Sequence, residues 1–314
     1  MGVTLEHPLL RFLNKDRGPI VKITTARREI ERGGPFFYST ARLSSTIADG
    51  FRDGDVLAFG GGGWSLDRQV SQEKAIVEAV ERWAFLHYLH HSPEIAGLQF
   101  DSTSNGFAAI PKAFGMNFAM DHAFCEATER FLLNRFWLSR DLALERIPIE
   151  TASLEVRSLM KTQNASFELW RTTLDGSSPV TPNRGPLTFV LALGWRSSGG
   201  VVPGSACGHG LVEVTDRAIL EAITHVNAVR RIEEGSIAVG ETVTDRRLVF
   251  FANNGESVRE ALAECSKSNQ AAPRPKVLIA AALPGPWEPE VLVTRVVVAD
   301  SPPIIEGDEK RFLI

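Results

Sequence analysis

The feature that most constrains the fold is a charged motif that occurs twice, in two stretches with helical periodicity. The first copy reads Glu-Ala-Val-Glu-Arg-Trp from Glu78, and the second reads Glu-Ala-Thr-Glu-Arg-Phe from Glu126. Positions i, i+3 and i+4 share one face of an α-helix, so each helix presents two carboxylates and one guanidinium together. The candidate site residues are Glu78, Glu81 and Arg82 in the first copy and Glu126, Glu129 and Arg130 in the second.

Two interpretations of this motif are open. A charged helix face is typical of a surface helix, where the side chains form i,i+4 ion pairs in water. Here, however, apolar residues surround the charges, including Trp83 and Phe131 directly after the arginines. Carboxylates in apolar surroundings need compensation, and Mg²⁺ binds carboxylate and phosphate oxygens while arginine pairs with phosphate. Two such helices facing each other can therefore hold Mg²⁺ and a nucleotide polyphosphate.

The remaining periodicity predicts a mixed fold of helices and strands. We expect helices over 70–89 (with Ser71 as N-cap), 117–138, 151–161, 214–232 and 258–268. We expect strands over 35–44, 167–173, 187–195, 247–251, 276–283 and 290–299, with loops at 60–63 and 92–116. This alternation predicts an α/β or mixed α+β fold. No low-complexity linker divides the chain, so residues 1–314 are expected to form a single domain.

Composition excludes several classes of protein. The chain has 34 basic and 38 acidic residues, so no broad basic surface is expected and nucleic-acid binding is excluded. Its three cysteines are scattered, which is typical of a reducing compartment. No segment has the apolar length of a membrane span or signal peptide. These features predict a cytoplasmic protein that binds no membrane.

Other candidate sites are weaker. The Gly60–Gly63 run can cradle phosphate, but it matches no nucleotide-binding motif. The segment Cys207–His209 resembles a metal or nucleophile pair, yet further ligands at zinc spacing are missing, so it is interpreted as a loop feature. The histidines within 87–91 suit a helix end, and Cys125 is expected to be a small apolar core residue.

Taken in order, the motifs resemble the YcaO family over about residues 55–235. The carriers of the resemblance are a glycine-rich turn at 61–63, the two Glu-x-x-Glu-Arg helices, the Asn-Gly-x-Ala-Ala segment at 105–109, and Gly204-Ser205-Ala206 followed by a helix containing Glu221. The resemblance implies a YcaO-like fold, in which long helices pack on mixed β-sheets around an ATP/Mg²⁺ cleft. A strand-rich part is expected to follow over 245–314.

The resemblance also implies a function. YcaO proteins bind ATP and Mg²⁺ and activate a peptide amide in a ribosomally synthesised precursor. The usual product is an azoline formed from Cys, Ser or Thr in bacteriocin-like natural products, and some relatives make thioamides or amidines. By position, the implied metal and phosphate ligands are Glu78, Glu81, Glu126, Glu129 and Glu221, with Arg82, Arg130 and Asn105 beside the nucleotide.

The sequence departs from the family pattern at several positions. Trp64 replaces a lysine, Lys74 a serine, Phe131 an aspartate and Thr224 a glutamine, and the proline-rich C-terminus of many azoline-forming members is absent. The departures leave a second hypothesis open, namely a catalytically degenerate scaffold or substrate-binding subunit. The expected partners are a precursor peptide, a precursor-recognition protein or paralogous subunit, and a second copy of the chain in a homodimer.

Overall fold

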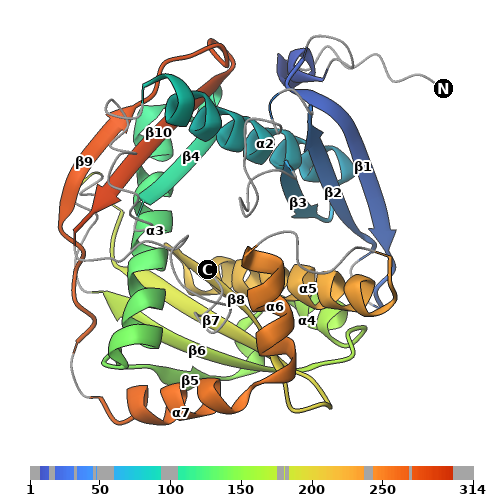
Figure 1. Cartoon of the computed structure of the whole chain (residues 1–314), viewed down its shortest axis with the longest axis vertical. Helices are drawn as coiled ribbons and strands as arrows, with labels where there is room; N and C mark the ends of the chain where they lie inside the picture. Colours follow the sequence, from blue (N-terminus) through green and yellow to red (C-terminus); the bar gives the residue numbers. More distant parts are fainter. Residues whose placement is uncertain are drawn as a thin grey trace.

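The computed structural model describes residues 8–13, 18–31, 34–44, 47, 60–92, 105–174, 180, 184–236, 243–268 and 271–299. These residues form three antiparallel sheets with helices packed between and around them (Figure 1). The first sheet has the order β1 (Ile20–Arg28), β2 (Phe36–Leu43), β3 (Gly61–Ser65). The second has the order β4 (Asn105–Pro111), β10 (Val291–Val298), β9 (Val277–Ala282). The third has the order β5 (Glu145–Ile147), β6 (Ser166–Leu174), β7 (Leu187–Trp195), β8 (Val201–Gly208).

Six α-helices lie in the described part of the chain. They are α2 (Arg68–His91), α3 (Met116–Asn134), α4 (Leu154–Met160), α5 (Leu211–Glu233), α6 (Val243–Asn253) and α7 (Glu256–Cys265). Short helical turns are the 3-10 segments η1 (Pro8–Phe12), η3 (Lys112–Phe114) and η5 (Ile149–Thr151), and a π-helical turn, η4 (Arg135–Ser139), that continues α3. None of these helices is long and apolar enough to cross a membrane.

Three strand–helix units surround the centre of the molecule: β3 with α2, β4 with α3, and β8 with α5 (Figure 1). In each unit a strand glycine lies directly against the backbone of its helix. A Cβ on Gly106 would lie 1.7 Å from the Ala123 carbonyl oxygen, and one on Gly204 would lie 2.4 Å from that of Ala218. A Cβ on Gly61 would likewise lie 2.2 Å from the Ala75 carbonyl oxygen. Only glycine permits this approach.

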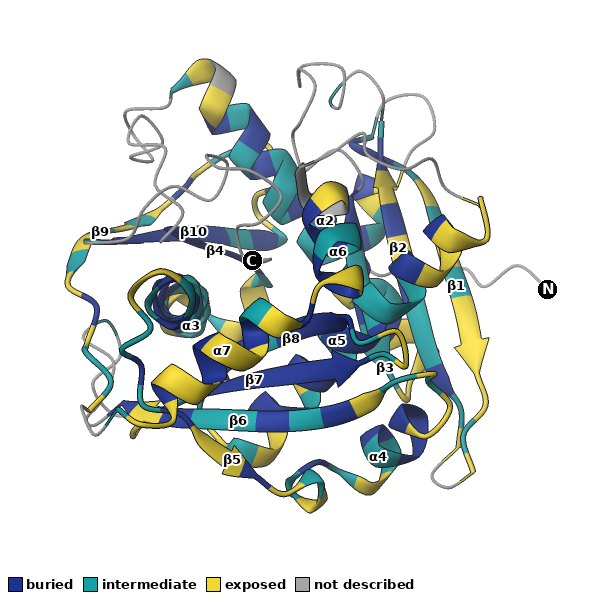
Figure 2. Cartoon of the chain, turned by 60° about the horizontal axis from the view of Figure 1, so that its bottom comes forward, coloured by how far each residue is buried: buried dark blue, intermediate teal, exposed yellow. Residues whose placement is uncertain are grey.

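Two of the apolar clusters lie on opposite faces of the β5–β8 sheet. β7 is buried along almost its whole length, because helices cover both sides of it (Figure 2). Leu191 belongs to a cluster shared with α3 and α7, and Val190 belongs to a cluster shared with α4 and α5. Residues that alternate along a strand point to opposite faces, so one apolar strand serves both clusters.

The mixed fold class is confirmed, and its described ladders are antiparallel. Several local predictions were wrong. The glycine run at 60–63 and the expected loop at 92–116 contain β3 and β4, since their glycines are needed for helix contact rather than for turns. The expected strand 247–251 belongs to α6, where Leu248, Phe251 and Ala252 are buried at helical spacing. The part expected to be strand-rich, 245–314, therefore begins with α6 and α7. β1 was missed.

The start of α2 was also predicted wrongly. Asp67 is the N-cap, and its side chain accepts a hydrogen bond from the Val70 amide at 3.0 Å. Ser71, the expected cap, lies inside the helix and is buried, and its hydroxyl is 2.7 Å from the Ser39 hydroxyl. The helix therefore begins one turn earlier than the apolar pattern suggested.

Candidate functional site

The five predicted glutamates lie partly buried on the inner faces of three helices. Each accepts a hydrogen bond from a strand backbone N–H, which fixes the position of its carboxylate. Within each unit the first glutamate binds the strand that precedes its own helix: Gly62 N to Glu78 at 2.7 Å, Phe107 N to Glu126 at 2.8 Å, and Ser205 N to Glu221 at 2.6 Å.

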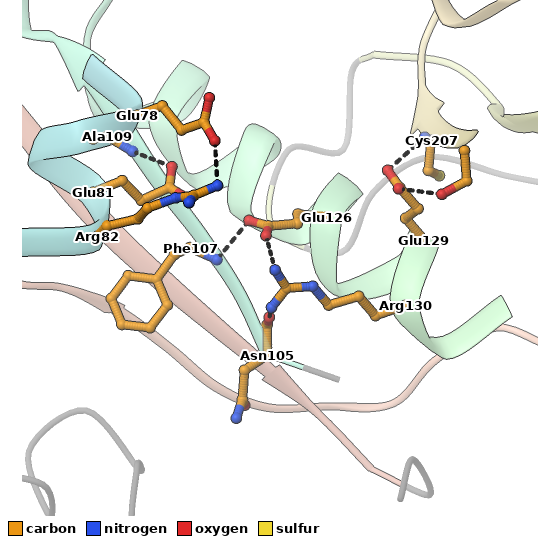
Figure 3. A network of polar contacts seen from close by, with 11 residues as sticks. Glu78, Glu81, Arg82, Asn105, Phe107, Ala109, Glu126, Glu129, Arg130 and Cys207 are labelled. Atoms are coloured by element: carbon orange, nitrogen blue, oxygen red, sulfur yellow. Dashed lines mark hydrogen bonds and ion pairs between the residues drawn. The ribbon is translucent and has the colours of Figure 1, made fainter. Parts of the chain in front are cut away.

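The residue three positions later on each helix reaches the strand of the next unit. Glu81 accepts from Ala109 N at 3.1 Å, and Glu129 accepts from Cys207 N at 3.1 Å (Figure 3). In the third unit Thr224 occupies this position and accepts from the indole nitrogen of Trp64 at 2.8 Å. Trp64 lies on β3, so the three units close into a ring.

The ring is a threefold repeat of one local design. The anchoring strand residues are two apart and the helix residues three apart, so each set faces the same way. Arg130 donates to the Asn105 carbonyl oxygen at 2.5 Å and pairs with Glu126 (Figure 3). In the third unit the ring nitrogen Nδ1 of His225 lies 2.6 Å from the Pro203 carbonyl oxygen. Only two copies of the motif are recognisable in the sequence, because the third unit has Thr224 and His225 in place of the second glutamate and the arginine.

The structure brings the predicted residues together. Arg82 pairs with Glu78 at 2.5 Å, and Glu129 also accepts from the Ser205 hydroxyl at 2.6 Å. Asn105 takes part through its backbone carbonyl group. The ion pairs within the motif agree with the surface-helix interpretation, but the carboxylates are anchored to strands at a helix–sheet contact rather than lying on an outer face.

Burial and mutual repulsion make the carboxylates difficult to ionise. Burial raises the pKa of Glu81 well above its usual range, and the nearby Glu126 and Glu78 raise it further. Burial followed by the charge of Glu129 raises the pKa of Glu221 to about 8. Burial also raises the pKa of Glu126, although Arg130 opposes the shift. Such a cluster is ready to exchange its protons for a divalent cation.

Burial of the carboxylates and their mutual repulsion predict that stability falls as pH rises. The native state holds a proton on Glu221 until about pH 8, whereas the unfolded chain loses it near pH ~4.3. Between these values the native state binds more protons, so the free energy of unfolding decreases with pH by at most about 1.4 kcal/mol per pH unit for each such carboxyl. Urea unfolding at pH 6 and pH 8 without divalent cations measures the slope. Glu221→Gln should flatten it, and an unchanged slope in this variant would contradict the assignment.

Three departures from the family pattern contact one another. Trp64 donates to Thr224, and the Lys74 ammonium group donates to the Trp64 carbonyl oxygen at 3.1 Å. Trp64 also packs on Tyr38, with ring centroids 4.6 Å apart. The three replaced residues therefore form one coupled local arrangement, which places a cation one helical turn before Glu78.

Arg295 is a site residue that the sequence analysis missed. It is fully buried on β10, with its guanidinium 4.5 Å from the centre of the Phe107 ring. None of its three side-chain nitrogens has a hydrogen-bond partner among the described residues. Burial followed by the charge of Arg130 lowers the pKa of Arg295 to about 9. An arginine inside the apolar run 291–298 was the available signal.

The weaker candidates have different outcomes. Cys207 lies in β8 and not in a loop, and Cys125 is a buried residue as expected. Burial raises the pKa of Cys125 to about 12, so its thiol is neutral at physiological pH. His87 and His91 stack at the end of α2. The structure places Asp121 and Cys125 beside His209, a proximity that the sequence spacing did not indicate.

Comparisons with known proteins identify the family. A family model described as YcaO cyclodehydratase, ATP- and Mg²⁺-binding, matches residues 83–281. No curated protein sequence shows a significant match to the chain. A chain of the E. coli microcin synthetase McbBCD complex is 10% identical, with a TM-score of 0.57 and coverage of 96% of this chain and 95% of that one. The same complex with pro-MccB17 bound gives 11% identity, a TM-score of 0.52 and coverage of 91% and 92%.

A third structure, YcaO from Methanopyrus kandleri bound with AMPPCP and Mg²⁺, is 15% identical, with a TM-score of 0.49 and coverage of 94% and 89%. The microcin synthetase structures share the fold across nearly the whole chain, and the family model spans more than half of it. The chain therefore belongs to the YcaO family of ATP- and Mg²⁺-binding cyclodehydratases.

Proposed function

We propose that this chain is an ATP-dependent enzyme that modifies a peptide backbone, with ATP and Mg²⁺ bound by the ring of glutamates. The observation that carries the proposal is the convergence of five anchored, partly buried carboxylates whose charges oppose one another. Mg²⁺ prefers such oxygen ligands and shares them with phosphate. The unmatched guanidinium of Arg295 supplies positive charge for an anion beside the same ring.

The hydrogen bonds divide four of the five carboxylates into two groups, whereas Glu129 uses its two oxygens for Cys207 N and the Ser205 hydroxyl. Glu78 and Glu126 each use one oxygen for a strand amide and the other for an arginine. Glu81 and Glu221 each use Oε2 for a strand amide, and their Oε1 atoms make no hydrogen bond within the described part of the chain. These two Oε1 atoms are therefore the best placed to ligate Mg²⁺. The arginine-paired glutamates orient guanidinium groups toward phosphate.

The proposed reaction is cyclodehydration of Cys, Ser or Thr to an azoline. The side-chain thiol or hydroxyl adds to the preceding carbonyl carbon, which gives a hemiorthoamide with a new hydroxyl group. ATP supplies the phosphoryl group that this oxygen accepts, and phosphate then leaves as the nitrogen loses its proton and C=N forms. The chain's contribution is to position the phosphates and neutralise their charge, which is the main source of catalysis in phosphoryl transfer.

Substrate delivery is proposed to require a partner. Two of the structural neighbours are parts of a microcin synthetase complex, one of them with pro-MccB17 bound. By analogy with that assembly, we propose a ribosomally made precursor peptide as substrate and a recognition protein or paralogous subunit as partner. A homodimer and a cytoplasmic location stay predictions.

The three units are also proposed to belong to one domain spanning residues 1–314. The strand of each unit binds a side chain from the helix of the preceding unit. β4 binds Glu81 of α2, β8 binds Glu129 of α3, and β3 binds Thr224 of α5. Unfolding of one unit would therefore remove anchors from its neighbours. Coincident unfolding transitions by fluorescence and circular dichroism test this proposal.

Phosphate release tests the proposed activity. The purified chain, its recognition partner and the precursor peptide are expected to release phosphate in step with loss of water from the peptide, which mass spectrometry detects. A hydrolase that leaves the peptide unchanged would contradict the proposal. Formation of a thioamide or an amidine would agree with the same ATP site and would mean that a different nucleophile attacks the amide.

A degenerate scaffold is the second candidate function. The replacement of the family's lysine by Trp64 favours it. Lys74 argues against complete loss of function, because its ammonium group lies beside Trp64 on the face that carries Glu78. Burial lowers the pKa of Lys74, and the charge of Arg217 lowers it further. Failure of Mg²⁺ and ATP to bind either the chain or its complex would favour the scaffold.

Replacing Arg295 separates stability from binding. Arg295→Met should raise the free energy of unfolding of the ligand-free protein by about 1–4 kcal/mol, since it removes an uncompensated buried charge. The same change should weaken ATP binding, since a phosphate partner is lost. Thermal unfolding with and without Mg²⁺ and ATP measures both effects. A less stable variant with unchanged nucleotide affinity would show that Arg295 has a purely structural role.

A further inference from the structure

Along the contact between α3 and β8, every fourth residue of the helix lies opposite every second residue of the strand. Four residues of helix rise about 6 Å, and two residues of strand rise about 6.6 Å. Positions 129, 125 and 121 on α3 therefore match, in that order, positions 205 and 207 on β8 and position 209 just beyond its end. Glu129 bonds Ser205 at 2.6 Å at one end, and Asp121 Oδ2 lies 3.3 Å from His209 Nε2 at the other.

The Asp121 end of this contact gathers three different metal-ligating groups. One ligand atom each from Asp121, Cys125 and His209 lies within 4.8 Å of the other two. Asp121 and Cys125 are 2% and 6% exposed, and the side chain of His209 is 20% exposed. His209 Nδ1 is buried and has no hydrogen-bond partner in the described structure. Nε2 is the ring nitrogen that faces Asp121, so an ion beside Asp121 would bind Nε2 and leave Nδ1 to an outer partner such as water.

The separation between the histidine and carboxylate donor atoms fits a small tetrahedral ion. His209 Nε2 lies 3.4 Å from Asp121 Oδ1 and 3.3 Å from Oδ2, which is long for a hydrogen bond. Zinc holds nitrogen and oxygen at ~2.0–2.1 Å, so two tetrahedral ligands of this kind are ~3.3 Å apart. The histidine and the carboxylate already have this separation.

We propose that Asp121, Cys125 and His209 bind a transition metal ion of the Zn²⁺ class, separate from the glutamate ring. A thiolate and a carboxylate together balance the two positive charges, and the thiol proton is released to solvent on binding. Sulfur and nitrogen ligands select Zn²⁺ over Mg²⁺, which prefers oxygen alone.

The surroundings of the cluster are consistent with an ion at this position. Arg184 donates to Asp121 Oδ2 at 3.3 Å and fixes the carboxylate from the side, as outer partners of metal ligands do. The described residues supply three ligands, and water can take a fourth position, as at catalytic zinc sites. The ion would lie on α3 about one helical turn from Glu126 and Glu129.

Cobalt binding tests this site in the intact protein. With saturating Mg²⁺ on the glutamates, we expect one equivalent of Co²⁺ to bind with a thiolate-to-cobalt charge-transfer band that Zn²⁺ abolishes. Cys125→Ser and His209→Ala should each remove the band. Cys265→Ser, which changes a buried cysteine on α7, should retain it. Glu126→Gln should also retain it, which separates this site from the proposed ATP site.

Several outcomes would overturn the proposal. Folded protein that shows no cobalt band would contradict the site, and so would a band that survives Cys125→Ser. Loss of the band in Cys207→Ser alone would assign the sulfur ligand to Cys207 instead. Should the variants fail to fold, X-ray absorption of the unmodified protein loaded with Zn²⁺ decides. We expect one sulfur at ~2.3 Å with nitrogen or oxygen at ~2.0–2.1 Å, and the absence of a sulfur shell would contradict the site.

Discussion

Glu126→Gln and Glu129→Gln are each expected to reduce phosphate release by at least about 100-fold. Glutamine retains the size of the side chain and removes the charge that a divalent cation requires. In Glu126→Gln the guanidinium of Arg130 also loses its ion-pair partner. In Glu129→Gln one side-chain atom becomes an N–H donor and can no longer accept from both Cys207 N and the Ser205 hydroxyl. Phosphate release with precursor and partner measures both variants.

An exposed glutamate provides the matched control. Glu260 lies on the outer face of α7, so Glu260→Gln should retain full activity. Unfolding curves of the three variants show that any loss is not caused by misfolding. Unchanged turnover in Glu126→Gln or Glu129→Gln would refute the proposed ATP site, whatever the peptide product.

Gly106→Ala is expected to have the largest effect on folding. The new Cβ would lie 1.7 Å from the Ala123 carbonyl oxygen and 2.5 Å from the Ala127 amide nitrogen. Both neighbours are backbone atoms, so β4 and α3 must separate by more than an ångström. That movement breaks the bond between Phe107 N and Glu126. We expect a loss of more than about 4 kcal/mol in the free energy of unfolding, as in the most damaging core substitutions.

Gly208→Ala is the control for this change. Gly208 is also a strand glycine, but its Cβ would meet only the side chains of Val214 and Arg217, at 3.3 and 3.4 Å. Small side-chain movements relieve such contacts, so this variant should lose much less stability. Guanidinium unfolding compares the two variants. Equal stability of Gly106→Ala and the unmodified protein would contradict the close packing of β4 on α3.

The sequence predicted the helices of the site better than its strands. Two units were recognisable because the letters of Glu-x-x-Glu-Arg repeat and the helical period is long. The third unit was recognised only through its resemblance to the family, from Gly204-Ser205-Ala206 and the helix with Glu221, since Thr224 and His225 occupy the positions of the second glutamate and the arginine. β3 and β4 were interpreted as turns because glycine has two uses, and spacing alone does not distinguish a turn from close contact with a helix.

The spacing of residues along the sequence could not identify groups that come together only through tertiary contacts. Cys207 and His209 were noticed, but their neighbours on α3 are 78 or more residues earlier in the chain. Arg295 belongs to a strand whose other members are mostly apolar, and its proximity to Glu126 depends on the pairing of β10 with β4. The residue types were visible in the sequence, whereas their convergence follows from sheet order.

Isothermal titration of the purified chain with ATP, in the presence and absence of Mg²⁺, tests the central claim most directly. We predict one ATP site that requires Mg²⁺ and is lost when EDTA removes the metal, because carboxylates repel a polyphosphate unless a divalent cation joins them. Binding of equal strength without Mg²⁺, or no binding by the folded chain or its complex, would contradict the glutamate ring as a nucleotide site.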